Sequence, residues 1–342
     1  MEFMHFTIWT EKRPGKGEDA VPTLLVNDDY TQGVLVVYDG LGGAGSKLYT
    51  YQDNQGKTVA HTGAYLASRL AKQITEHFFA TISTGEEVEK DFIAGLKTDL
   101  LKGFADKVDQ IDQNPSKLRS KLIKRLPTTL AGLYYTSDTH QQLKVTSFWA
   151  GDSRCYALTA NGLCQLSNDD LNGTPDALEN LLMDATISNC IHADGKYSIN
   201  QSTVLVKEPV ILITATDGCF GFVKSPAHFE YLLLQALMNS QYDAEAWKEC
   251  LEEAMGAIAG DDLSMSVLAL GRKTLEDWKV YFYERFKYVQ ARFVRPVEEA
   301  EASMQFLQKQ EGFLPVETEK LYKQKRLLLE QLWQAYKENY YG

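Results

Sequence analysis

The first part of the chain alternates apolar and polar positions in short runs that are typical of β-strands. Three such runs cover 4–9, 23–27 and 33–40, and proline, glycine or Asn-Asp residues bound them. From about Thr58 to Ile82 the apolar residues change to helical spacing, and a second stretch of this kind follows from about Glu86 to Val108. The pattern predicts strands first, and then two amphipathic helices that pack together on one face of a sheet.

Strand-like runs return further along the chain, where they cover 128–136, 144–151, 154–160 and 203–218. Asn161-Gly162 between two of these runs is typical of a β-hairpin. Helical patterns follow at about 227–238 and 244–259, and a last strand-like run covers 263–271. This order of strands and helices indicates the α+β class with mostly antiparallel sheets.

The 71 residues beyond Gly271 have no strand-like run. Their apolar residues recur at helical spacing on both sides of a break at Gly312 to Pro315. The apolar positions are Trp278, Phe282, Phe286, Val289 and Phe293, and then Leu321, Leu328, Leu332 and Tyr336. We therefore expect a main domain over 1–271 and a helical C-terminal extension over 272–342, which agrees with a length of 342 residues.

Composition narrows the class of protein. With 44% hydrophobic and 24% charged residues the chain can bury a large core, which excludes fibrous and disordered proteins. The net charge of -11 repels phosphate backbones, so we expect no nucleic-acid partner. Five scattered cysteines without a C-x-x-C pair, no signal-peptide pattern and no apolar run long enough for a membrane span predict a cytoplasmic protein with reduced thiols.

Acidic residues recur at the ends of predicted strands, each beside a small or turn-forming residue. They are Glu18-Asp19, Asp39-Gly40, Gly151-Asp152-Ser153, Asp217-Gly218 and Gly260-Asp261-Asp262. Hard divalent cations prefer oxygen ligands, and carboxylates from several strands converge only where strand ends meet. Any single Asp-Gly pair is explained as well by a turn, but their joint occurrence indicates a two-metal hydrolytic site.

Six stretches, in this order, resemble the metal-dependent type 2C serine/threonine protein phosphatases. They are KGEDAV, VVYDGLGGAGS, PTTLAGLYY, WAGDSRCYALTANGLCQLS, ILITATDGCF and GDDLSMSVLAL, and the resemblance spans about Met4 to Gly271. It implies a four-layer sandwich, in which two central antiparallel sheets are flanked by helices. It also implies hydrolysis of phosphoserine and phosphothreonine by a water or hydroxide that bridges two Mg²⁺ or Mn²⁺ ions, which lower its pKa and neutralise the phosphoryl group.

The resemblance also implies the metal-binding residues, which are Glu18, Asp39, Gly40, Asp152, Asp217 and Asp261. Asp39 would bridge the two ions, Glu18 would orient a water, and Asp152 would help to hold a third, weaker ion. Asp19 and Asp262 are expected to anchor these ligands or nearby backbone amides.

Three positions depart from the family pattern. The arginine that usually clamps the phosphate is replaced by Pro14, so we expect the neighbouring Arg13 to act with Asp39 and Asp217 as a catalytic residue. Leu41 stands where animal members often have histidine. The usual Asp-His is Asp169-Asp170, and the segment from there to about Ser198 matches no pattern, which is most simply explained as a solvated loop, with a role in substrate choice as the alternative.

Other motifs carry weaker hypotheses. Gly40, Gly42 and Gly45 fit a dinucleotide-binding fingerprint, but no helix is predicted at the third glycine. His61 is interpreted as a surface or capping residue.

The extension holds 13 Lys and Arg against 11 Asp and Glu, which leaves -13 for residues 1–271. We expect the extension to pack back on this acidic domain, with binding of a kinase or another protein as a further role. The chain is thus predicted to be a protein-serine/threonine phosphatase that acts on a phosphorylated protein. The alternatives are an inactive phosphatase-like binding module and an esterase for a small phosphomonoester.

Overall fold

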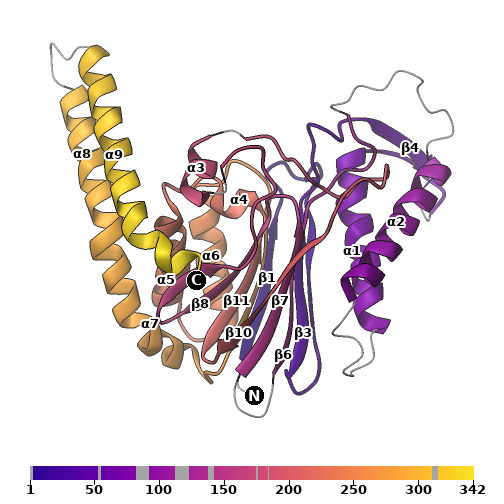
Figure 1. The fold of residues 1–342 in the computed structure, drawn as a ribbon, viewed down its shortest axis with the longest axis horizontal. Helices are drawn as coiled ribbons and strands as arrows, with labels where there is room; N and C mark the ends of the chain where they lie inside the picture. The colour runs from indigo at the N-terminus through magenta and orange to yellow at the C-terminus, as the bar shows by residue number, and fades with distance from the viewer. Residues whose placement is uncertain are drawn as a thin grey trace.

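The computed structural model shows a sandwich of two five-stranded sheets (Figure 1). It describes residues 3–52, 55–81, 92–111, 123–137, 142–174, 176–183, 185–309 and 315–342. In one sheet the strands are ordered β1 (Phe3–Thr10), β12 (Leu263–Leu270), β11 (Val210–Ala215), β8 (Arg154–Thr159) and β9 (Gly162–Gln165). In the other they are ordered β10 (Asn200–Lys207), β7 (Gln142–Ala150), β6 (Leu130–Ser137), β3 (Gln32–Tyr38) and β2 (Ala20–Val26). All neighbouring strands are antiparallel.

Alternation along the strands separates the apolar core into layers. In β3, Leu35 and Val37 face the other sheet, whereas Val34 and Val36 face the helices outside. Because successive side chains of a strand point to opposite faces, a strand buried on both faces must be apolar throughout. The result is a four-layer α+β sandwich of helices, sheet, sheet and helices, as expected from the family resemblance.

The helices α1 (Gly63–Thr81) and α2 (Phe92–Ile111) cover the outer face of the sheet that contains β3. The predicted start of the first helix at Thr58 was wrong. Residues Thr58–Thr62 form strand β5, which pairs with β4 (Leu48–Gln52), so their backbone groups bond across this hairpin instead of along a helix. The predicted start of the second helix at Glu86 lies outside the described residues.

Helices of the main domain and the start of the extension lie on the side of the sheet that contains β12. They are α4 (Asp217–Phe220), α5 (Pro226–Asn239), α6 (Ala244–Gly256) and α7 (Leu275–Val289). The run predicted at 203–218 is two strands, β10 and β11, in different sheets, because the chain leaves one sheet at Lys207 and enters the other at Val210. The short helix α3 (Ala177–Leu182) lies between β9 and β10 in the chain.

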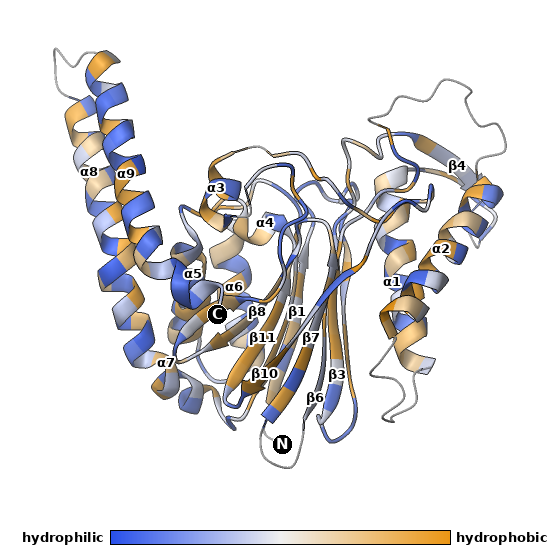
Figure 2. Cartoon of the chain, in the orientation of Figure 1, coloured by the Kyte–Doolittle hydropathy of each residue, from blue (hydrophilic) through white to orange (hydrophobic). Residues whose placement is uncertain are grey.

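The C-terminal extension is helical, as predicted. After α7 and a π-helical turn (Gln290–Val294), α8 (Arg295–Gln308) and α9 (Pro315–Tyr340) form two long neighbouring helices that project from the sandwich (Figure 1). Figure 2 shows hydrophilic residues along much of α9, unlike the largely hydrophobic strands. The predicted break falls mostly on 310–314, outside the described residues.

Both ends of the extension return to the main domain. Trp278 of α7 and Tyr340 of α9 are fully buried in the same apolar cluster as β8 and β12 residues. The extension therefore packs back on the sandwich, as expected. None of the described helices has the length and apolar character that a membrane crossing requires.

Candidate active site

A cavity of about 840 Å³ lies at the end of the sandwich where the predicted acidic residues meet. Its acidic lining residues are Glu18, Asp19, Asp39, Asp217, Asp261 and Asp262, and Gly40 lines it too. Asp39 and Asp217 come just after β3 and β11, whereas Glu18 and Asp261 come just before β2 and β12. Because neighbouring strands are antiparallel, the end of one strand and the start of the next lie at the same edge.

Asp152 lies beside this cavity rather than in its lining. It occupies the turn between β7 and β8 and lines an adjoining cavity of about 320 Å³, to which Asp217 also contributes. The negative charge of Asp152 is one cause of the raised pKa of Asp39. The structure therefore brings all the predicted metal-binding residues into one region at adjoining cavities.

Gly40 and Gly218 allow a close approach of backbone segments at the cavity. A Cβ atom at Gly40 would lie 2.5 Å from the carbonyl oxygen of Glu18, and one at Gly218 would overlap the carbonyl oxygen of Asp262. A side chain at either position would push these segments apart. The Asp-Gly pairs are thus needed for packing between segments that are distant in the sequence, beyond any role in a turn.

Two threonines that precede β6 hold the backbone of Asp39. The Thr128 hydroxyl donates to the Asp39 carbonyl oxygen at 2.7 Å, and the Thr129 amide donates to the same oxygen at 2.8 Å. The Thr129 hydroxyl also lies 2.7 Å from the Ser153 hydroxyl. The Thr-Thr motif therefore ties Asp39 to the turn that carries Asp152.

Asp262 and Asp19 anchor the segment that carries Glu18, as predicted. The Asp262 carboxylate accepts hydrogen bonds from the Glu18 amide at 2.7 Å and the Lys12 amide at 2.8 Å. Asp19 accepts a hydrogen bond from the Thr216 hydroxyl at 3.0 Å. Sequence reasoning missed Thr62, whose hydroxyl donates to the Glu18 carboxylate at 2.6 Å, because 58–62 was assigned to a helix.

The carboxyl groups of the site have strongly perturbed pKa values. Burial, and then repulsion from Asp19 and Asp217, raises the pKa of Asp39 well above its usual range. Burial and repulsion from Asp217 raise the pKa of Asp19 to about 8 and that of Asp152 to about 8. Burial and repulsion from Asp261 raise the pKa of Asp217 to about 6. Ionisation of these carboxyl groups is therefore unfavourable unless a cation is bound among them.

The donor chemistry of the site fits a hard divalent cation. All the predicted ligands offer oxygen, and Asp152 Oδ1 is buried without a hydrogen-bond partner among the described residues. However, no three acidic, histidine or cysteine side chains of the described residues are close enough together in this arrangement to hold one ion. The residues present thus suit Mg²⁺ or Mn²⁺ in chemistry, while the ligand geometry that surrounds an ion is not formed.

The structure gives the cavity a basic residue that the sequence did not suggest. Arg13 is exposed and is not among the lining residues, whereas Lys124 is the only cationic side chain among the described residues that line the cavity. Its Nζ lies 3.1 Å from Cys190 Sγ, and its amide donates to the Ala44 carbonyl oxygen at 3.1 Å. Lys124 belongs to no recognised motif, so only the three-dimensional arrangement reveals it.

The segment without a sequence pattern after Asp170 forms part of the cavity wall. Asn172, Thr186 and Ile187 line the larger cavity together with the acidic residues. This segment is therefore more than a solvated loop. His61 does not line the cavity; its ring stacks on Tyr65 at 4.1 Å, in agreement with the surface interpretation.

Known structures share this fold. The Mycobacterium tuberculosis serine/threonine phosphatase PstP/Ppp is 18% identical, with a TM-score of 0.52 over 80% of this chain and 100% of that chain. Stp1 from Staphylococcus aureus is 16% identical, with a TM-score of 0.54 over 79% of this chain and 95% of that chain. No protein-family model and no curated protein matches the chain. At these identities the likeness establishes the fold, which is that of the bacterial type 2C phosphatases.

Proposed function

We propose that this chain is a metal-dependent phosphoprotein phosphatase that hydrolyses phosphoserine and phosphothreonine. The observation that carries the proposal is the meeting of six carboxylates from separate strand ends at one cavity. The fold supports it, since a solved structure of the PstP catalytic domain, 16% identical over 78% of this chain and 97% of that chain with a TM-score of 0.50, holds two manganese ions.

Each residue of the site has a proposed task. The residues that would hold two Mg²⁺ or Mn²⁺ ions, and a third at Asp152, are Glu18, Asp39, Gly40, Asp152, Asp217 and Asp261. When bound, such ions neutralise phosphoryl charge and lower the pKa of the attacking water. Asp262 and the Thr128-Thr129 pair keep the ligand-bearing segments in position through the hydrogen bonds described above.

We further propose that Lys124 binds the phosphate of the substrate. Among the described residues it is the one cation that lines the cavity and it forms no ion pair, so its charge is available to an anion. Arg13, the residue expected from the sequence, stays a prediction. The two assignments differ in position: one residue lines the cavity and the other lies on an exposed segment.

The test is hydrolysis of a phosphoserine or phosphothreonine peptide by the full chain, with and without Mn²⁺. We expect turnover that requires Mn²⁺ and that falls by roughly 10³-fold in Asp39→Asn and Asp217→Asn, the scale of losing one strong electrostatic contribution in an active site. Asp106→Asn, on the exposed face of α2, is the matched control and should retain activity. A wild-type chain without turnover, or full turnover in both site variants, would contradict the proposal.

The alternatives make different predictions in the same assay. An inactive binding module would give no turnover under any metal condition, and its function would then lie in recruiting a protein, such as a kinase, through the C-terminal helices. An esterase for small phosphomonoesters would turn over an aryl phosphate but not the peptide. We also propose that residues 1–271 carry the reaction in the cytoplasm, while residues 272–342 have a supporting role.

A further inference from the structure

The segment between β9 and β10 forms one wall of the candidate site, and we call its described residues, 168–174, 176–183 and 185–189, the cavity loop. Asn172 and Thr186 line the larger cavity, whereas Asn180 and Met183 line the adjoining one. The cavity loop has little regular structure, since α3 is its only helix among the described residues. Its position must therefore depend on contacts with the rest of the molecule.

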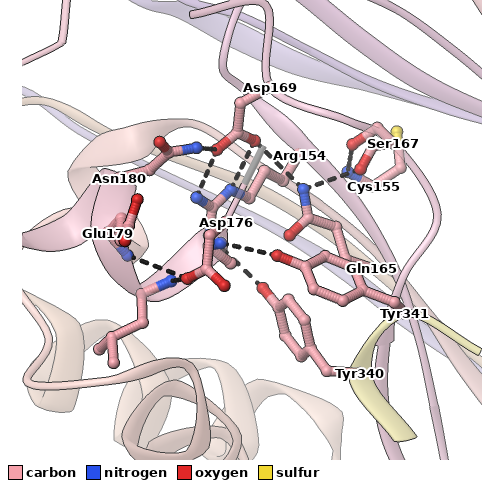
Figure 3. A network of polar contacts seen from close by, with 12 residues as sticks. Arg154, Cys155, Gln165, Ser167, Asp169, Asp176, Glu179, Asn180, Tyr340 and Tyr341 are labelled. Carbon is pink, nitrogen blue, oxygen red and sulfur yellow. Dashed lines mark hydrogen bonds and ion pairs between the residues drawn. The ribbon is translucent and has the colours of Figure 1, made fainter. Parts of the chain in front are cut away.

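The C-terminal helix α9 makes the first of these contacts, at the start of α3. The Trp333 indole donates to Asp176 Oδ2 at 2.9 Å, and the Ala177 amide donates to the Tyr341 hydroxyl at 2.6 Å, just beyond the end of α9. Asp176 is also the N-cap of α3, where its other carboxylate oxygen accepts from the Leu178 amide at 3.0 Å. Figure 3 shows Tyr341 beside Asp176 at this point.

A second contact joins the same end of α9 to the turn that carries Asp152. The Arg154 guanidinium lies between the Asp169 carboxylate, at 2.8 and 2.6 Å, and the Tyr340 hydroxyl, at 3.4 Å (Figure 3). Arg154 and Tyr340 are buried, with 2% and 0% of their surface exposed. The neighbouring Asp170 accepts a hydrogen bond from the Gly151 amide at 3.1 Å. The start of the cavity loop is thus fixed to the acidic site and to the tail together.

These contacts differ from the others that α9 makes. The Tyr336 hydroxyl, one turn before Tyr340, donates to Glu230 in α5, which lies outside the cavity loop and lines neither cavity. Tyr336 is also buried, with 2% of its surface exposed. The rings of Trp333, Tyr336 and Tyr340 pack together, but their polar groups have different partners: that of Trp333 bonds to the cavity loop, whereas that of Tyr336 bonds to another helix.

We propose that Trp333, Tyr340 and Tyr341 are positioning residues of the candidate active site, which hold the cavity loop against its acidic face. The extension would then support the substrate-binding wall from more than 140 residues away in the chain. The proposal deepens the phosphatase proposal and rests on it for the identity of the substrate. The ordering of the loop by the tail does not depend on that identity.

The first experiment measures amide hydrogen exchange in peptides that cover 168–189, in the full chain without metal. Trp333→Phe and Tyr341→Phe each remove one polar contact to the loop and keep an aromatic ring, and Tyr336→Phe is the matched control. We expect exchange in the loop to become roughly fivefold to tenfold faster in the double variant Trp333→Phe/Tyr341→Phe, the scale of losing one or two hydrogen bonds. Tyr336→Phe should lower Tm without changing exchange in the loop.

Unchanged exchange in the double variant, or an equal increase in Tyr336→Phe, would overturn the proposal. The second experiment measures KM and kcat for a phosphopeptide at saturating Mn²⁺. We expect the KM of the double variant to rise by about fivefold, with kcat within about twofold of wild type, because the loop contributes binding wall rather than ligands. Faster exchange with unchanged KM would overturn the positioning role. Absence of wild-type turnover would instead contradict the phosphatase proposal, while the exchange comparison still decides whether the tail orders the loop.

Discussion

Two groups of enclosed carboxylates in this protein differ in how their charge is balanced. Asp169 and Glu230 are each held by two hydrogen bonds from an arginine, Arg154 at 2.8 and 2.6 Å and Arg285 at 2.6 and 2.8 Å. The carboxylates of the candidate site form no ion pair with a Lys, Arg or His side chain among the described residues. The chain thus neutralises the first group itself and leaves the second group to be neutralised from outside.

The difference indicates that the arginine-paired acids stabilise the fold, whereas the unpaired acids are available for chemistry. An acid paired with a buried arginine has its desolvation offset within the fold. The pairing raises the pKa of Arg285, through hydrogen bonding and attraction from Glu230, against the opposing effect of burial. Ionisation of an unpaired buried carboxyl group destabilises the fold until a cation binds. Because the cation removes this destabilisation, the site has a higher affinity for it. Variants can test whether the two groups behave as this comparison requires.

The largest effect on stability is expected when a structural pair is broken. Arg285→Met leaves Glu230 buried and unpaired, with 0% of its side chain exposed, so the free energy of unfolding should fall by about 3–5 kcal/mol. Urea unfolding monitored by circular dichroism measures it. The control is Lys323→Met in the exposed Glu319–Lys323 pair, which should cost less than about 0.5 kcal/mol. A similar loss in the free energy of unfolding for the two variants would contradict the structural role of the buried pair.

The next largest effect should be the pH dependence of stability. It arises from the unpaired carboxyl groups of the site and not from a broken ion pair. A carboxyl group whose pKa is raised on folding stabilises the fold fully below its unfolded value, and this contribution is lost as pH rises through the folded value. The raised pKa values of about 6 for Asp217 and about 8 for Asp19 place the loss between about pH 4 and 8. Manganese should reverse it, because cations bind the ionised form.

We therefore expect the stabilisation by Mn²⁺ to grow from near zero at pH 5 to on the order of 3 kcal/mol at pH 8. Urea unfolding at each pH, with Mn²⁺ and with a chelator, measures this difference directly. Calcium at the same concentration tests whether any hard divalent cation suffices. A cation effect that is equal at both pH values would mean that the site carboxyls do not titrate as the comparison states.

The site carboxylates could be predicted from the sequence because each is fixed by a local pattern. Asp39 directly follows a strand that is apolar on both faces, and Asp217 comes just after another, so each must lie at a sheet edge. The α+β class followed from the order of strand and helix patterns, and the four-layer arrangement followed from the family resemblance. The predicted start of the first helix was wrong because residues 58–62 pair with residues 48–52, and the spacing of apolar residues within one segment does not show such a pairing.

The remaining features depend on contacts between distant segments. Lys124 lines the cavity because its backbone bonds to Ala44, 80 residues earlier in the chain, and no local motif marks that approach. The helices of the extension were predictable from their apolar spacing. Their contact with the cavity loop was not, since Trp333 reaches Asp176 across 157 positions of sequence.

A smaller effect is expected for Asp39→Asn, which should raise the free energy of unfolding where Arg285→Met lowers it. In the metal-free protein at pH 8 this substitution removes a buried carboxyl group whose ionisation the fold opposes, so stability should rise by about 1–2 kcal/mol. The stabilisation by Mn²⁺ should largely disappear. Asp106→Asn on the exposed face of α2 should change neither quantity. A destabilised metal-free Asp39→Asn would place Asp39 in the structural group instead.

The smallest effect that we predict concerns the cation within the acidic site. Lys124→Gln should raise KM for a phosphopeptide by about tenfold, which corresponds to about 1.4 kcal/mol of lost binding. Arg13→Gln, on the exposed segment outside the cavity, should change KM by less than twofold, a threshold that corresponds to roughly 0.4 kcal/mol. Competitive inhibition by inorganic phosphate should weaken in parallel with KM in Lys124→Gln. The reverse ranking would return phosphate recognition to Arg13, and would mean that Lys124 serves the fold through its contacts with Cys190 and Ala44.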